Sequence, residues 1–86
     1  MSRGRKLIRR FLAKPRDFSF AELTALLRGY GYSEMKSGQS SGFRAAFINE
    51  DSKHIIRLHK PHPSRILKRY QLDEIESELR KKGYIR

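Results

Sequence analysis

The stretch FRAAFINEDSKHIIRL, residues 43–58, carries the pattern that decides the fold. Residues 43–49 and 53–58 each predict a β-strand, because β-branched and aromatic residues favour an extended, half-buried backbone. Glu50 and Asp51 lie between them, at the expected tip of a hairpin. The sequence therefore predicts an antiparallel pair of strands near the middle of the chain.

A loop centred on Glu50 and Asp51 also predicts a register, since the turn fixes which residues face one another. One face then pairs Phe43 with Leu58, Ala45 with Ile56 and Phe47 with His54; the other pairs Arg44 with Arg57, Ala46 with Ile55, and Ile48 with Lys53. The same register places Gly42 opposite His59. Two arginines directly across a strand pair repel one another, so this arrangement predicts an anion between them.

A helix is expected before the hairpin. Ser19 and Glu22 have capping-box spacing, and Phe18 and Leu23 occupy the positions of a hydrophobic staple. The apolar stripe that follows consists of Leu23, Leu26, Leu27 and Tyr30. Gly29 and Gly31 are expected to end the helix.

A second helix is expected after the hairpin, over residues 71–82. Leu72, Ile75 and Leu79 recur on one face, and Gly83 is the expected C-cap. Residues 32–36 predict a short edge strand, and residues 61–70 predict a basic connection.

The N-terminal residues 1–15 form a basic extension. Leu7, Ile8, Phe11 and Leu12 recur in it at helical spacing, and Pro15 stops the pattern. Two alternatives remain open, a helix docked on the domain or a partly ordered arm, and docking is the expectation.

The element order is therefore helix, three strands and helix, preceded by the extension. Helices segregated beside an antiparallel sheet make an α+β sandwich, and double-stranded-RNA-binding domains have this α-β-β-β-α order. At 86 residues the chain is expected to hold one domain, over residues 16–86.

Composition narrows the function. Lys and Arg number 20 against 9 Asp and Glu, a formal charge of +11, which predicts a polyanionic partner. The chain has no cysteine, and neither a membrane-spanning apolar run nor a signal-peptide pattern is found, so a cytoplasmic location is expected.

Four segments, taken in order, resemble HicA-type toxins of bacterial toxin–antitoxin pairs. Residues 18–32, from FSFAEL to GYGY, resemble the family's first helix; GQSSGFR, residues 38–44, its Gly-Ser tract; LHKPHP, residues 58–63, the His-x-Pro-His motif of a longer subgroup; and LRKKGYI, residues 79–85, its C-terminal helix. The resemblance implies a double-stranded-RNA-binding-like fold, endoribonuclease activity on mRNA, and neutralisation by a HicB-type antitoxin. Many members carry the catalytic histidine in or just after the Gly-Ser tract, where this chain has Ser40, Ser41 and Gly42.

Two readings of that departure stay open. In one, His59 takes the catalytic role, with His62 as a second acid or base. RNA supplies its own 2′-hydroxyl nucleophile, so a metal-free nuclease needs a group that titrates near neutrality and cations for the phosphorane. The candidate phosphate-binding residues are Arg44, Arg57, Lys60, Arg65, Lys68, Arg69, Ser40, Ser41 and Gly42.

In the other interpretation, the chain binds RNA without cutting it.

No cofactor and no metal is expected, because His54 and His59 point to opposite faces of the sheet and no cysteine completes a ligand set. His54 should face inward and be hydrogen-bonded. A membrane-surface or acidic-protein binder is a third reading, in which residues 1–14 lie on anionic lipid.

Overall fold

The computed structural model describes residues 2–35, 44–61 and 63–85. These residues form, in order, α1 (Ser2–Leu12), α2 (Phe20–Gly29), β1 (Tyr32–Glu34), β2 (Arg44–Asn49), β3 (Ile55–His59) and α3 (Arg69–Lys81). The strands make one antiparallel sheet in the order β1-β2-β3. The α+β class predicted from the sequence is confirmed. None of the described helices is long and apolar enough to cross a bilayer.

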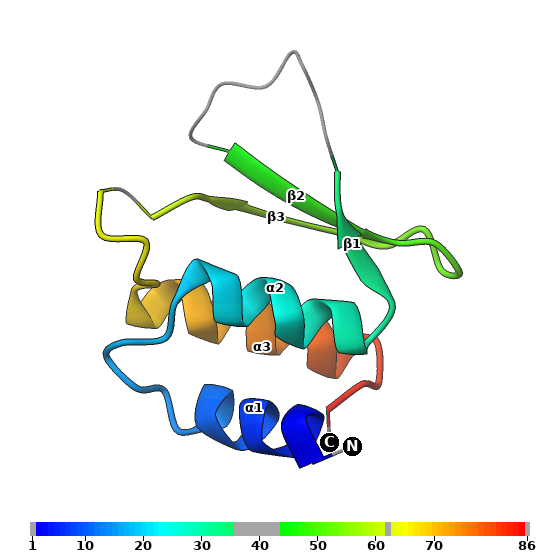
Figure 1. Ribbon diagram of the computed structural model, residues 1–86. Helices are drawn as coiled ribbons and strands as arrows, with labels where there is room; N and C mark the ends of the chain where they lie inside the picture. Colours follow the sequence, from blue (N-terminus) through cyan, green and yellow to red (C-terminus); the bar gives the residue numbers. More distant parts are fainter. Residues whose placement is uncertain (1, 36–43, 62, 86) are drawn as a thin grey trace.

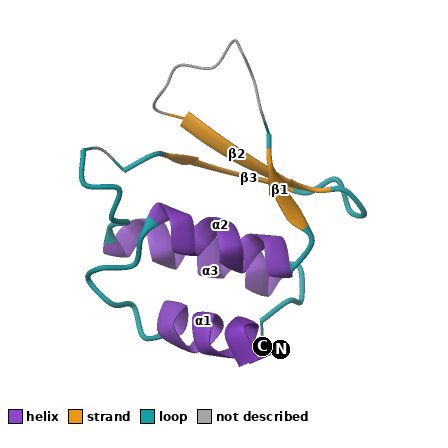
Figure 2. Cartoon of the chain, in the orientation of Figure 1, coloured by secondary structure: helices purple, strands orange, loops and turns teal. Residues whose placement is uncertain are grey.

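The elements stack in layers (Figures 1 and 2). The sheet lies over α2 and α3, and α1 lies beneath those two helices, on the side away from the sheet. The core therefore fills the space between the sheet and the helices and continues below them. Its buried apolar residues are Phe11, Phe18, Leu23, Leu26, Leu27, Tyr32, Ala45, Phe47, Ile56, Leu67, Leu72, Ile75, Leu79 and Ile85.

The predicted capping box begins α2. The Ser19 hydroxyl accepts a hydrogen bond from the Glu22 backbone N–H at 3.1 Å, and the Glu22 carboxylate accepts one from the Ser19 N–H at 2.9 Å. Tyr30 caps the other end, and Gly31 follows with φ +93°. A Cβ at Gly31 would lie 3.2 Å from Asn49 Nδ2, so both backbone conformation and space favour glycine there.

The predicted register of the hairpin is wrong by two residues. Ala45 lies opposite Leu58, not Ile56, and Phe47 lies opposite Ile56, not His54. The loop is the reason: Asn49 N–H donates to the His54 carbonyl at 2.9 Å, so residues 50–53 all belong to the loop. Because the shift is even, every side chain keeps its predicted face.

The other pairs follow the same shift. Arg44 lies opposite His59, Ala46 opposite Arg57, and Ile48 opposite Ile55, in place of the predicted Arg57, Ile55 and Lys53. Gly42 and Phe43 lie outside the described residues. Leu58, the predicted partner of Phe43, lies opposite Ala45, and His59, the predicted partner of Gly42, lies opposite Arg44.

Helix α3 begins two residues earlier than the predicted Gln71, at Arg69, and ends at Lys81. Its predicted stripe is confirmed, because Leu72, Ile75 and Leu79 are all buried. Gly83 follows with φ +82°, the left-handed conformation that suits the end of a helix. Strand β1 is shorter than predicted and ends at Glu34.

The N-terminal extension is a docked helix. Phe11 is fully buried, and its ring meets the edge of Phe18 with centroids 5.6 Å apart. Arg10 bridges Asp17 at 3.0 Å and Glu22 at 2.8 Å, which ties α1 to the start of α2. Just beyond the helix, Lys14 pairs with Asp73 and Glu76 of α3. Apolar contact and ion pairs therefore hold α1 on the domain.

Candidate nucleic-acid interface

The two faces of the sheet differ in what covers them. Helices α2 and α3 lie against one face, and the side chains of Ala45, Phe47 and Ile56 are buried there. Side chains alternate along a strand, so Arg44 and Arg57 belong to the opposite face, and both are exposed. We call this opposite face the outer face. No described helix covers it (Figure 1).

Arg44 and His59 form a close cross-strand pair on the outer face. Asn49 and His54 are hydrogen-bonded across the ladder, and pair types alternate along antiparallel strands. The Arg44–His59 pair lies an odd number of positions along the ladder from the hydrogen-bonded Asn49–His54 pair. Because the two types alternate, Arg44 and His59 form a non-hydrogen-bonded pair. In such a pair the Cα atoms are about 4.5 Å apart, which brings the two side chains near one another.

Arg57 completes a triangle of cationic and imidazole side chains. It lies across from Ala46 and diagonally from Arg44, and the repulsion between diagonal arginines is weaker than the direct opposition predicted from the sequence. The small Ala46 leaves a hollow of about 390 Å³. Its lining residues are Met35, Arg44, Ala45, Ala46, Arg57, Leu58 and His59. This hollow is the candidate site.

The charge of the candidate site is uncompensated in the described part of the chain. No described carboxylate forms an ion pair with Arg44 or Arg57. A guanidinium presents a planar fork of donors that matches a phosphate. Two such groups beside an imidazole can hold a phosphodiester and move a proton next to it.

Lys60 is separated from this group. It follows β3 and lies 3.8 Å from the Glu34 carboxylate, with its ammonium 5.8 Å from the centre of the Phe20 ring. Phe20 begins α2 and packs against the buried Phe47, so Lys60 lies at the helix-side rim of the sheet. A phosphate bound by Lys60 would therefore lie at the helix-side rim of the sheet and not on the outer face.

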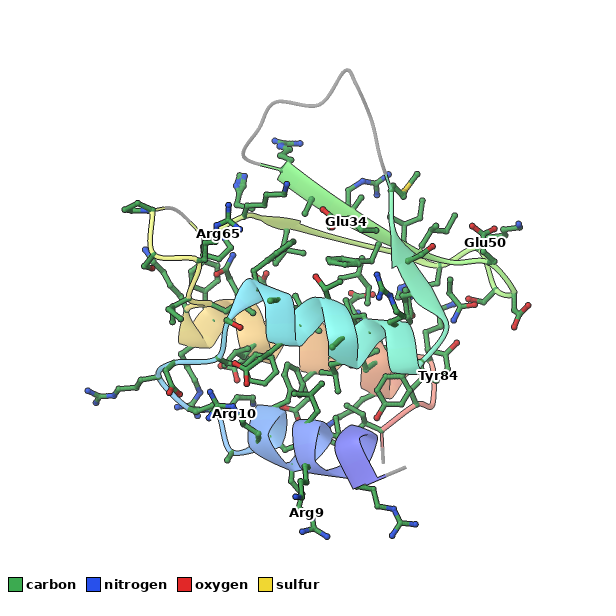
Figure 3. The ribbon with its side chains drawn as sticks, in the orientation of Figure 1. Arg9, Arg10, Glu34, Glu50, Arg65 and Tyr84 are labelled. Atoms are coloured by element: carbon green, nitrogen blue, oxygen red, sulfur yellow. The ribbon has the colours of Figure 1, made fainter. Side chains whose placement is uncertain are left out.

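Three other predicted cations gather where α2 and α3 begin. Arg65 is exposed in the connection before α3, and its carbonyl accepts a hydrogen bond from the Phe20 N–H at 2.9 Å. Lys68 caps α3 and Arg69 is its first residue. The Gln71 amide donates to the His59 carbonyl at 2.8 Å, which ties this end of α3 to the end of β3. Figure 3 shows Arg65 at the same end of the molecule as these elements.

His54 has structural partners on the helix side of the sheet. Its Nδ1 lies 2.7 Å from the Tyr32 hydroxyl and its Nε2 lies 2.8 Å from Glu78, so both ring nitrogens are engaged. Burial is the main reason that the pKa of Tyr32 rises to about 12. The prediction that His54 faces inward and is hydrogen-bonded is confirmed, although it lies beyond Phe47, at the level of Asn49.

Four predicted site residues, Ser40, Ser41, Gly42 and His62, lie outside the described residues. Among residues 2–35, 44–61 and 63–85, no group of three or more acidic or histidine side chains is arranged to hold a metal ion. Comparison with protein-family models, with curated proteins and with solved structures finds no match.

Sequence reasoning missed the hollow itself. Met35 and Ala46 were not candidates, because their role follows from pairing across three strands. The available signal was the small Ala46 between the larger Arg44 and Ile48 on one face of a strand. A small residue at such a position leaves a gap between its neighbours, but only the register shows that Arg57 stands across it.

Proposed function

We propose that this chain is an RNA-binding endoribonuclease of the HicA toxin type, with a double-stranded-RNA-binding-like fold and mRNA as its substrate. The observation that supports this most is the Arg44–His59 pair beside Arg57 on the open outer face. The net charge of +11 supports a polyanionic substrate. The arrangement of the elements agrees with the fold, although a fold alone does not determine a function.

The proposed reaction needs no external nucleophile. The 2′-hydroxyl of RNA attacks the neighbouring phosphorus, and the bond from phosphorus to the 5′-oxygen breaks. The 2′-hydroxyl loses its proton and the departing 5′-oxygen gains one, so the products are a 2′,3′-cyclic phosphate and a 5′-hydroxyl. His59 transfers a proton in this reaction, and Arg44 and Arg57 stabilise the charge of the pentacoordinate phosphorus.

The basic end of the molecule extends the proposed RNA path. Arg65, Lys68 and Arg69 lie at the end where β3 stops, so they hold phosphates that flank the one being cut. Arg69 lies 3.5 Å from Asp73 and is partly neutralised, so Arg65 and Lys68 contribute more. A HicB-like antitoxin in the cytoplasm would neutralise the toxin by covering the outer face.

The experiment is RNA cleavage by the purified protein in EDTA, compared with His59→Ala and with the control Lys82→Gln. Lys82 is exposed at the end of α3, and its replacement should leave cleavage unchanged. We expect wild type and control to produce cyclic-phosphate ends and His59→Ala to produce none, while all three bind RNA. RNA that is bound but stays intact with the wild type would refute the nuclease and leave a non-catalytic RNA-binding module.

Two further variants test the cations. Loss of one transition-state donor slows catalysis by about 10²–10³-fold, so Arg44→Gln and Arg57→Gln should each slow cleavage of bound RNA by roughly that factor. Cleavage by His59→Ala at the wild-type rate would overturn the assignment of His59 and direct the search to His62.

A further inference from the structure

Helix α1 presents a second basic surface, on the side of the molecule opposite the outer face. Arg5, Lys6 and Arg9 are all exposed. In Figure 3 the Arg9 side chain points away from the layer of α2 and α3, whereas the sheet lies beyond that layer. We call these three residues the α1 cations. They are not part of the candidate site.

The cations of the extension divide into two groups. Arg10 and Lys14 form ion pairs with carboxylates of α2, α3 and the loop before α2, so they anchor the helix. No carboxylate in the described part of the chain pairs with any of the α1 cations. The anchoring of α1 therefore does not require them.

The α1 cations also disfavour the helix that carries them. Arg5 and Arg9 are four residues apart, where like charges repel along one helix face. The first turn has no acidic residue to match the positive end of the helix dipole. The apolar residues Leu7, Ile8 and Phe11 supply the packing instead. Neither packing nor helix formation explains the α1 cations, which are therefore available to bind a ligand.

The chemistry of the surface selects the ligand. An amphipathic helix binds lipid by burying its apolar face in the membrane, but here Phe11 is fully buried and Leu7 and Ile8 pack on the core. What remains exposed is charge, which suits a chain of phosphates. We propose that the α1 cations form a second RNA-binding surface, which contacts the sugar-phosphate backbone of the RNA held at the outer face. This proposal rests on the proposed function for the choice of RNA as the polyanion and for the RNA held at the outer face, but not for the cleavage of that RNA.

A single RNA chain can reach both surfaces. The molecule measures 35 × 31 × 21 Å along its principal axes, so the way around it is short compared with an mRNA. Contacts at α1 would then increase the affinity for long RNA without touching the phosphate that is cut. The surface should affect binding and its salt dependence, and leave the chemical step unchanged.

The test measures RNA affinity over a range of salt concentrations. One variant combines Arg5→Gln, Lys6→Gln and Arg9→Gln. The matched control combines Lys53→Asn, Lys81→Gln and Lys82→Gln, which removes the same charge from exposed positions at the hairpin tip and the end of α3. Lys53 and Lys81 already lie near Glu50 and Glu78, so these control positions are partly compensated.

Each phosphate contact contributes about 0.7 to the slope of log K against log salt concentration for single strands. We expect the α1 variant to bind more weakly, with a slope smaller by about 2. The control should change the slope by less than half as much. The cleavage rate of saturated protein should be the same in all three proteins, and thermal unfolding confirms that each is folded.

Equal slope changes in the two variants would overturn the proposal, because the effect would then be one of net charge. An unchanged RNA slope, together with loss of binding to vesicles of anionic phospholipid, would overturn it in favour of a lipid surface. If the wild type binds RNA without cutting it, the proposed nuclease function fails. The slopes of log K against log salt concentration would still decide whether α1 contacts RNA. If the wild type does not bind RNA, both proposals fail.

Discussion

Asn49 at the end of β2 offers the sharpest test of how this fold is held together. Its side chain is buried and makes four hydrogen bonds. The amide Nδ2 donates to the Tyr30 carbonyl at 3.0 Å and to the Tyr84 hydroxyl at 2.7 Å. The amide Oδ1 accepts from the backbone N–H groups of Asp51 at 2.9 Å and Ser52 at 3.1 Å. One side chain thus joins the end of α2, the hairpin loop and the C-terminal segment.

The variant Asn49→Ala removes all four bonds. A hydrogen bond contributes about 1 kcal/mol net to stability, so the free energy of unfolding should fall by about 4 kcal/mol. The loss is large beside the 5–15 kcal/mol that typically stabilises a domain. The matched control is Tyr84→Phe, which keeps the ring and removes one of the four bonds, at about 1 kcal/mol.

Urea unfolding followed by circular dichroism measures both variants, and amide hydrogen exchange locates the effect. The Asp51 and Ser52 amides should exchange faster in Asn49→Ala and at the wild-type rate in Tyr84→Phe, because only the first variant removes their acceptor. If Asn49→Ala loses no more stability than Tyr84→Phe, the reasoning is refuted. The loop would then hold its shape without the Asn49 side chain.

Two further predictions concern the docking of α1. Phe11→Ala should weaken docking by about 3–5 kcal/mol, because the ring is fully buried, whereas Leu12→Ala should change stability by less than about 0.5 kcal/mol. Faster tryptic cleavage after the exposed Arg16 in the first variant alone would confirm this. Acid should also weaken the docking of α1. A hydrogen bond from Arg10 lowers the pKa of Glu22 below its ordinary value of 4.5, and one from Lys14 lowers the pKa of Glu76 in the same way. The stability that these pairs contribute is therefore present above pH 4.5 and is lost as the pH falls through the lowered pKa values. Exchange rates of α1 amides between pH 6 and pH 3 measure this loss, and protection that stays constant over that range would contradict it.

The sequence by itself determined the features that depend on residues close together in the chain. The capping box is a contact between Ser19 and Glu22, and the stripe on α3 follows from helical spacing. Both follow from local geometry, so the sequence alone predicted them. The faces of the strands were also predictable, because alternation depends only on the parity of each position. Alternation therefore predicts that Arg44, Arg57 and His59 share one face of the sheet.

Only the tertiary structure decided the register of the hairpin. The Asn49 side chain holds the loop, and its other partners, Tyr30 and Tyr84, are far away in the sequence. No pattern within residues 43–58 contains them. The resulting register puts Arg44 opposite His59 and opens the hollow over Ala46, so the geometry of the candidate site depends on it.

The tertiary structure also decided which carboxylates pair with individual lysine side chains. Lys14 pairs with Asp73 and Glu76 of α3, and Lys60 is drawn towards Glu34, although nothing near either lysine in the sequence indicates its partner. The physical reason is the same in each case. Periodicity and caps act over a few residues, whereas the energy of an ion pair depends on distances in space that the folded chain alone sets.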